Sequence, residues 1–196
     1  MGSEPVTARA RRVGQRRDRV FDAAIELFVE QGYDATTMDD IAVRADVART
    51  SVFNYFERKT AFLDEWSARR RARAFHGTPR DGSGTLREEL AAITRELAAI
   101  SDTSRVATTA IIGAALRELD LLDDHPLSHE FLAVIRRHPE DLRDDIDQQL
   151  MGLTLATGYF AVLRAWIGDG PPPFDLGPRL LALLDLLLDG ASRSGR

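Results

Sequence analysis

Polar side chains able to hydrogen-bond to nucleic acid gather in one short stretch, residues 49–59, which reads RTSVFNYFERK. Arginine can form two hydrogen bonds with a guanine edge, asparagine can pair with an adenine edge, and hydroxyl groups bind either bases or phosphates. If the stretch is helical, Val52 and Phe56 share one apolar face, because residues four apart lie on the same side of a helix. The polar side chains then face outward, and the pattern predicts a DNA-reading surface made of Arg49, Thr50, Ser51, Asn54 and Tyr55.

The elements that must position this surface are also predicted by periodicity. Apolar residues at helical spacing predict a helix over 16–31, and Gly32 follows it where a residue with positive φ is wanted. Thr36 or Thr37 can cap a second, short helix that ends near Ala45, with an aspartate three residues on in capping-box relation. A three-residue turn then leads into the stretch at 49–56. Two short helices joined by such a turn are the plan of a helix-turn-helix.

Residues 16–64 resemble the DNA-binding domain of the TetR family of transcriptional regulators. The matching positions include the threonine pair, the Asp-Ile-Ala run and the aromatic pair before the lysine, and they are Thr36, Thr37, Asp40, Ile41, Ala42, Ala45, Val47, Tyr55, Phe56 and Lys59. Asp46 replaces the family's turn glycine, and Ala48 replaces the serine that caps the recognition helix. If the turn keeps a positive φ, aspartate is tolerated there at a cost of about 1 kcal/mol. Losing the cap costs a similar amount, about 1 kcal/mol.

The resemblance implies phosphate contacts beyond the recognition helix. Lys59 is the only lysine among 26 basic residues, and the family places a phosphate contact at this position, at the start of the next helix. The backbone N–H groups of a helix start favour an anion there. Thr37 is expected to make a second phosphate contact. The alternative for Lys59 is a solvated surface lysine.

The rest of the chain predicts helices and no strands, so the fold class is all-α. Glycine and proline in 76–85 mark a linker. Beyond the predicted helix at 60–75, helices are expected at 85–101, 105–121, 126–138, 140–168 and 177–190. The expected domains are a basic flexible arm at 1–15, a three-helix helix-turn-helix domain at 16–62, and a C-terminal helical bundle at 63–196. The arm could lie along phosphates or be a solvated tail.

The family resemblance implies that the C-terminal bundle forms a homodimer and encloses a small effector, for which a largely apolar molecule is the expected class. A two-fold dimer requires a near-palindromic operator in double-stranded DNA. The expected pocket residues are Trp66, Ile112, Leu116, Phe131, Tyr159 and Trp166, although aromatic residues at helical spacing can simply be core. The expected dimer interface is Ile146, Leu150, Leu153, Thr157, Leu180, Leu184 and Leu187.

Composition argues against other classes of protein. The chain has 196 residues and no cysteine, so it has no disulfides, thiol nucleophile or thiolate metal site. Motifs of hydrolases, phosphate-binding loops and zinc proteases are missing, and we expect no enzyme activity and no cofactor. His125 and His129 are four apart beside two aspartates, but Pro126 between them favours an exposed helix start over a metal site. Without an apolar segment for a membrane or a signal peptide, we expect a cytoplasmic protein.

The charge is divided unevenly along the chain. Residues 1–80 contain 15 basic and 12 acidic residues, whereas residues 81–196 contain 11 basic and 19 acidic ones. Opposite net charges indicate different partners for the two parts. The sequence as a whole therefore predicts a ligand-responsive repressor that binds DNA through its N-terminal part. The alternatives are an enzyme and a DNA-binding regulator without an effector.

Overall fold

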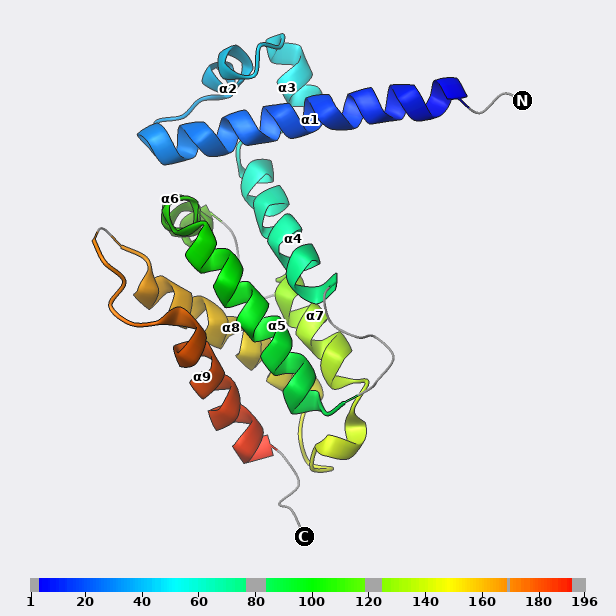
Figure 1. The fold of residues 1–196 in the computed structure, drawn as a ribbon, viewed down its shortest axis with the longest axis vertical. Helices are drawn as coiled ribbons and strands as arrows, with labels where there is room; N and C mark the ends of the chain where they lie inside the picture. The colour runs from blue at the N-terminus through cyan, green and yellow to red at the C-terminus, as the bar shows by residue number, and fades with distance from the viewer. Residues whose placement is uncertain (1–3, 77–83, 119–124, 169, 192–196) are drawn as a thin grey trace. The chain divides into compact units, whose positions relative to one another are not determined.

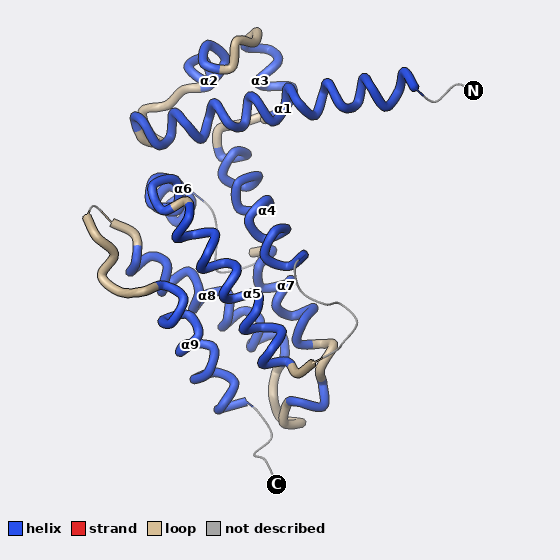
Figure 2. Tube along the Cα trace, viewed as in Figure 1, coloured by secondary structure: helices blue, strands red, loops and turns tan. Residues whose placement is uncertain are grey.

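The computed structural model describes residues 4–76, 84–118, 125–168 and 170–191 (Figure 1). All regular elements in these ranges are helices, so the predicted all-α class is confirmed, and the described backbone contains no strand (Figure 2). The chain divides into two compact units, Met1–Trp66 and Ser67–Arg196. The division falls inside one helix, α4, a few residues beyond the expected boundary at 62.

The first unit contains α1 (Glu4–Gln31), α2 (Met38–Arg44), α3 (Arg49–Tyr55) and the beginning of α4 (Thr60–His76). Helix α2 packs on both α1 and α3 (Figure 1). Aromatic rings fill the centre: Phe56 stacks on Phe62 with 4.0 Å between ring centroids, and Phe28 meets Phe62 edge-on at 6.2 Å. Arg17 on α1 closes this core by donating two hydrogen bonds to Glu65 on α4, at 2.8 and 2.7 Å.

The basic arm expected at 1–15 is not separate from the first helix. Residues from Glu4 onward are helical and continuous with α1, which is 28 residues long. Arginine is a good helix former, and the arm contains no proline after residue 5, so the helix extends through it. Its described side chains at Arg11, Arg12 and Arg16 are exposed.

The second unit contains the rest of α4, then α5 (Leu86–Thr103), α6 (Arg105–Glu118), α7 (Pro126–Ile135), a 3₁₀ turn (Pro139–Asp141), α8 (Gln148–Trp166) and α9 (Leu176–Ala191). Its tightest packing joins α7 to α8 and α5 to α9. The linker expected at 76–85 lies mostly outside the described residues.

The prediction of a single long helix over 140–168 is wrong about where the helix begins. Helix α8 starts at Gln148, because Asp147 acts as its N-cap and accepts hydrogen bonds from the backbone N–H groups of Gln149 and Leu150 at 2.9 and 3.0 Å. Ile146 therefore precedes the helix instead of lying on its face.

Two of the leucines expected at the dimer interface are buried within their own protomer. Leu180 and Leu184 are each 2% exposed, and with Leu188 they form the stripe of α9 that faces its own bundle. Because α9 packs on α5, these leucines, which are four residues apart, contact the other helices of the same chain. The outward side of α9 instead presents Leu186, which is 72% exposed.

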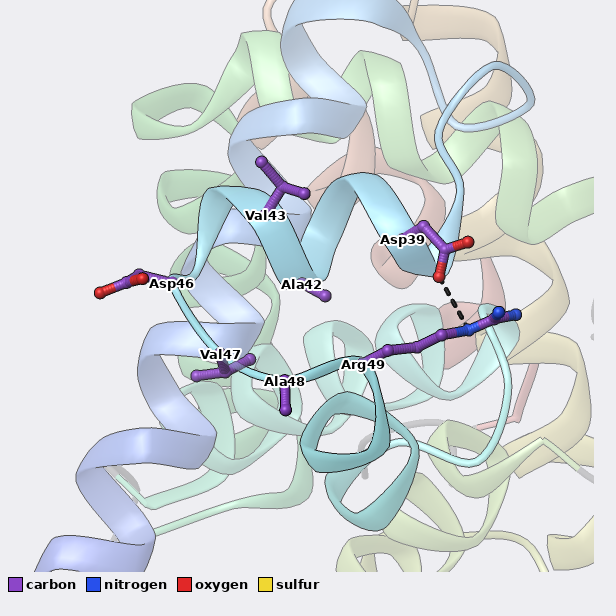
Figure 3. A pocket seen from close by; sticks show the side chains of 7 residues that line it. All are labelled: Asp39, Ala42, Val43, Asp46, Val47, Ala48 and Arg49. Atoms are coloured by element: carbon purple, nitrogen blue, oxygen red, sulfur yellow. Dashed lines mark ion pairs between the residues drawn. The ribbon is translucent and has the colours of Figure 1, made fainter.

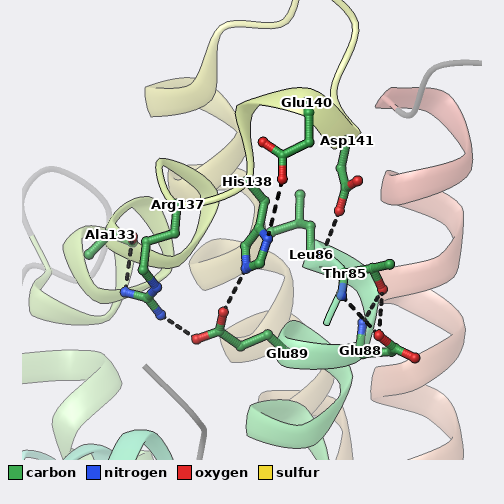
Figure 4. Close-up of polar contacts among 9 residues, drawn as sticks. All are labelled: Thr85, Leu86, Glu88, Glu89, Ala133, Arg137, His138, Glu140 and Asp141. Carbon is green, nitrogen blue, oxygen red and sulfur yellow. Dashed lines mark hydrogen bonds and ion pairs between the residues drawn. The ribbon is translucent and has the colours of Figure 1, made fainter. Parts of the chain in front are cut away.

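A buried charged cluster links α5 to the segment after α7 (Figure 4). Glu89 is 8% exposed and accepts hydrogen bonds from Arg137 and, at 2.8 Å, from His138, which is 2% exposed. Nearby, Asp141 accepts a hydrogen bond from the backbone N–H of Leu86 at 2.6 Å. These contacts fix the 3₁₀ turn against the start of α5.

Candidate DNA-binding site

The turn between α2 and α3 is a Schellman motif with Asp46 at its left-handed position. Asp46 has φ +52°, its N–H donates to the carbonyl of Val43 at 3.2 Å, and the N–H of Val47 donates to the carbonyl of Ala42 at 3.1 Å. The turn thus has the positive φ on which the tolerance of aspartate depends. Aspartate tolerates this conformation less well than glycine, so the turn contains a small conformational strain. It sets the angle at which α3 leaves α2.

Thr37 caps α2 as expected. Its hydroxyl accepts a hydrogen bond from the N–H of Asp40 at 3.1 Å and donates to the Asp40 carboxylate at 2.7 Å. The N–H of Thr37 donates to the same carboxylate at 2.9 Å, which completes a capping box. These hydrogen bonds hold the pKa of Asp40 below its usual value. The Thr37 side chain is exposed, so it remains reachable from solvent.

Helix α3 has the division of faces that its sequence predicts. Val52 is fully buried against the domain core, whereas Arg49, Thr50 and Asn54 are exposed. Ser51 and Tyr55 are half-buried. Ala48 makes no side-chain cap at the start of the helix, as its type requires. All five expected base- or phosphate-binding side chains are therefore on one short helix with at least part of each accessible.

Arg49 is held by exposed partners that an external ligand could replace. Its Nε lies 2.8 Å from the Asp39 carboxylate (Figure 3). Its guanidinium lies 5.5 Å from the centre of the Phe53 ring. An ion pair between two such exposed side chains contributes about 0–1 kcal/mol. The depression beside it is lined by α2, the turn and the start of α3, and Asp39 and Asp46 are its two acidic groups (Figure 3).

Lys59 has a structural role that the sequence did not reveal. Its ammonium donates to the backbone carbonyls of Tyr33, Thr36 and Asp34 at 2.8, 3.0 and 3.4 Å, and it lies 4.2 Å from the centre of the Tyr33 ring. Three N–H groups thus meet three carbonyl oxygens of the segment that joins α1 to α2. A phosphate contact by this side chain would have to compete with these carbonyls, and the phosphate role stays a prediction.

Two further residues on this surface were missed by the sequence reasoning. Phe53 is 38% exposed although it is aromatic, and it lies one turn after Arg49 on the same face of α3. The side chain of Arg58 is 73% exposed beside Lys59, with Asp64 3.9 Å away. Phe53 could have been identified from the sequence because it lies four residues after Arg49 and so on the same face of a helix. Arg58 could have been identified as a second basic residue just before α4.

The residues expected to line an effector pocket are mostly buried in the structure. Ile112, Phe131, Tyr159 and Trp166 are between 0 and 7% exposed, Leu116 is half-buried, and Trp66 is buried at the end of the first unit. Burial is compatible with either a pocket wall or a core position.

His125 is buried, not at an exposed helix start as expected. Its ring nitrogen accepts a hydrogen bond from the N–H of Leu127 at 3.1 Å and so caps α7, and burial lowers the pKa of His125 to about 4. Asp123 and Asp124, which suggested a metal site, lie outside the described residues. Within the described ranges no group of three metal-ligating side chains occurs, and no helix there is long and apolar enough to cross a membrane.

A short α2, a Schellman turn, and an α3 with a buried face and a polar outward face together define a helix-turn-helix protein of the DNA-binding class. Residues 20–66 match the family model described as bacterial regulatory proteins, tetR family. The structural likeness to regulators of this family extends over more than nine tenths of the chain. The N-terminal part of the chain therefore matches the DNA-binding domain of the TetR family.

Individual relatives are similar to this chain over different lengths. The negative transcriptional regulator IcaR of the biofilm operon icaADBC in Staphylococcus aureus is 39% identical over 49 residues, and its counterpart in Staphylococcus epidermidis is 40% identical over 43. These matches cover 25% and 22% of this chain, and only about a quarter of the length of the curated relatives (26% and 23%).

Solved structures resemble more than nine tenths of the chain. Thermus thermophilus FadR, a TetR-family repressor in complex with lauroyl-CoA, superimposes with a TM-score of 0.70 at 28% identity, over 92% of this chain and 97% of that one. SmeT, the repressor of the Stenotrophomonas maltophilia multidrug efflux pump SmeDEF, gives a TM-score of 0.70 at 21% identity over 91% of each chain, which supports the fold alone. The family and these relatives are regulators, in agreement with the expectation that the chain is not an enzyme.

Proposed function

We propose that this protein is a homodimeric transcriptional repressor that binds a near-palindromic operator in double-stranded DNA and is released by a small-molecule effector. The observation that carries the proposal is α3, whose outward face exposes Arg49, Thr50 and Asn54 while Val52 anchors the opposite face in the core. A helix of this kind enters the major groove, where base edges present distinct patterns of donors and acceptors. Such a repressor acts in the cytoplasm.

The contacts with DNA divide into two kinds. Arg49 and Asn54 read base edges, and Phe53, whose ring is exposed, contacts a thymine methyl group. Thr37, Ser51, Tyr55 and Arg58 are suited to phosphates, which fix the position of the protein but carry no sequence information directly. Lys59 contributes chiefly by holding the segment that presents Thr37.

The dimer uses the apolar surface that α8 and α9 leave exposed. Leu150 on α8 and Leu186 on α9 are 58% and 72% exposed, and Leu153, Thr157 and Leu187 are half-buried. Exposed apolar patches of this kind mark interaction surfaces. Gly158 supports a close crossing of α8 and α9, because a side chain there would meet Leu183 at 2.7 Å. Burying this surface in a two-fold dimer would place two copies of α3 about 34–36 Å apart, one turn of DNA.

An effector is supported by the relative that covers most of the chain. Thermus thermophilus FadR was solved with lauroyl-CoA, and the predicted pocket positions in the second unit of this chain are largely apolar. A ligand with a long apolar part would fit such residues. Release from DNA then requires that the ligand bind more tightly to the conformation that cannot hold the operator.

A mobility-shift experiment with the DNA upstream of the protein's own gene tests this function. We expect a retarded complex that forms preferentially on a near-palindromic site, that contains two protein chains, and that weakens steeply with salt. The control is a duplex of the same length and composition with one half-site scrambled. Equal binding to both duplexes would contradict the operator, and a complex unaffected by a broad panel of effectors would indicate a regulator without ligand control.

A further inference from the structure

The second unit contains a polar cluster inside its helical packing. Arg70 on α4 is 8% exposed and donates to the hydroxyls of Ser101, Ser104 and Thr108 at 2.5, 3.0 and 3.3 Å. Burial lowers the pKa of the Arg70 guanidinium, and its hydrogen bond with the Tyr159 hydroxyl opposes that change. Burying a charged group costs free energy unless the group is well hydrogen-bonded. The three hydroxyl groups therefore compensate for the burial of Arg70.

Beside this cluster, three buried polar atoms have no hydrogen-bond partner in the described part of the chain. They are Nε of Arg105, Oγ1 of Thr109 and Nε1 of Trp166. Trp166 is fully buried, and the guanidinium of Arg105 lies 5.1 Å from the centre of its ring. Buried N–H and O–H groups are nearly always satisfied in native proteins, and each exception calls for an explanation.

The orphaned atoms and the Arg70 cluster belong to one region between α6 and α8. Arg105 and Thr109 directly follow Ser104 and Thr108 along the chain, one helical turn apart on α6. Tyr159 and Trp166 lie two turns apart on α8, and residues at this spacing share a face. Hydrogen bonds and ring contacts thus connect α4, the start of α6 and the end of α8.

The position of Arg105 is unfavourable for the helix that it begins. The first residues of a helix lie at the positive end of its dipole, where a cation is disfavoured and an anion is favoured. No described acidic side chain forms an ion pair with Arg105, whose guanidinium instead lies over the indole ring of Trp166. Two buried N–H donors, one hydroxyl and an unneutralised cation therefore lie where an external acceptor would complete their hydrogen bonding.

We propose that the start of α6 and the end of α8 bind the acidic group of the effector, a carboxylate or a phosphate, through Arg105, Thr109 and Trp166. The inference rests on the proposed function, since it assigns the polar end of the same ligand. Its apolar part would lie along Ile112 and Phe131, which are 5% and 3% exposed. The effector is thus an amphiphilic acid and not a neutral hydrocarbon-like molecule. A fatty acid and a coenzyme A thioester are two sources of this chemistry.

Binding of defined probes to the full chain tests the proposal. The probes are laurate, lauroyl-CoA, coenzyme A alone and 1-dodecanol, each followed by thermal shift and by titration calorimetry. We expect laurate or lauroyl-CoA to bind about tenfold or more tightly than 1-dodecanol, because a hydrogen bond to a charged group is worth at least that ratio. Preference for lauroyl-CoA over laurate identifies the phosphate source, and the reverse identifies the carboxylate.

Three variants separate the site from general effects. Trp166→Phe keeps the ring and removes only the N–H, and Arg105→Gln removes the cation. Arg95→Gln on α5 changes the net charge equally at an exposed position. We expect Arg105→Gln to weaken binding of the acid about tenfold with little effect on 1-dodecanol, Trp166→Phe to weaken it severalfold, and Arg95→Gln to change neither. Circular dichroism melts confirm that each variant is folded, and Arg105→Lys provides a second variant if Arg105→Gln fails to fold.

Three results would overturn the inference. They are equal affinity of wild type for acid and alcohol, equal acid binding by Arg105→Gln and Arg95→Gln, and no binding of any probe, which would mean that the orphaned atoms hold water only. The operator experiment on the same preparations keeps the two proposals apart. Specific DNA binding with no response to acids removes this inference alone, whereas acid binding without operator binding removes the repressor function alone.

Discussion

The two units of this protein use polar side chains in opposite ways. In the first unit, Arg49, Thr50 and Asn54 of α3 are exposed, and Arg49 forms an ion pair with Asp39, which is also exposed. In the second unit, Arg70, Glu89 and His138 are each less than a tenth exposed and are hydrogen-bonded across helices. An exposed pair is worth about 0–1 kcal/mol, whereas breaking a buried one costs about 3–5 kcal/mol. Arg49 can therefore exchange its internal partner for an external one, whereas the three buried groups of the second unit cannot do so without loss of stability.

The largest expected effect lies in the buried network. Glu89→Gln should lower the free energy of unfolding by about 3 kcal/mol, because it leaves Arg137 and His138 without their buried carboxylate. The neighbouring exposed Glu88→Gln keeps a capping-box side chain and should change it by less than about 0.5 kcal/mol. Urea unfolding measures both. Equal losses in the two variants would show that burial does not distinguish these carboxylates.

A smaller loss of stability is expected at Lys59, which belongs to the first unit but is held by internal hydrogen bonds. Lys59→Met keeps the length of the side chain but removes three hydrogen bonds to carbonyls, and should cost about 2 kcal/mol of stability. Arg58→Met, at an exposed position, should leave stability unchanged and weaken DNA binding. If Lys59→Met melts like wild type but lowers the salt dependence of DNA binding by about one unit, the phosphate role predominates.

Changes on the outward face of α3 should affect DNA binding without affecting folding. Arg49→Ala and Asn54→Ala are expected to weaken operator binding by about 1–3 kcal/mol and to relax the preference at one base pair each. Arg73→Ala removes a comparable exposed ion pair in the second unit and should do neither. Competition shifts with single-base operator variants measure the preference. A uniform loss across all sequences would reassign Arg49 or Asn54 to phosphates.

The smallest expected effect concerns the turn. Asp46→Gly should stabilise the first unit by about 1 kcal/mol, since glycine adopts the left-handed conformation without strain. Asp46→Ala should destabilise it, because alanine tolerates positive φ less well than aspartate. Thermal unfolding compares the two variants. A gain from both would indicate that removing the charge matters more than backbone strain.

Local chemistry made the helix-turn-helix predictable. The capping box at Thr37 and the buried Val52 each depend on residues within five positions, so their spacing in the sequence contains the information. The positive φ at Asp46 was considered only because the family has a glycine at that position. The order of the helices was predicted from the family resemblance. The inward and outward faces of α3 followed from the same spacing.

Long-range contacts were not predictable in this way. Glu89 and His138 are 49 positions apart, and no pattern around either residue indicates that they meet. Lys59 binds backbone carbonyls. Because every residue has a carbonyl group, residue types do not indicate which carbonyls a lysine will bind. On α9, leucines surround most of the helix, so only packing on α5 decides that Leu180 and Leu184 face inward. The break before α8 depends on Asp147 acting as a cap within an otherwise helical pattern.

The contacts of Lys59 also determine how the protein should react with amine-specific reagents. Its side-chain amine is the only one in the sequence, and its three hydrogens are directed at carbonyl oxygens of the segment between α1 and α2. Acylation requires a free, deprotonated amine, so modification must await opening of that segment. A single-site labelling rate, separable from that of the chain's α-amine by peptide mapping, would thus report how often the entrance to α2 opens in solution.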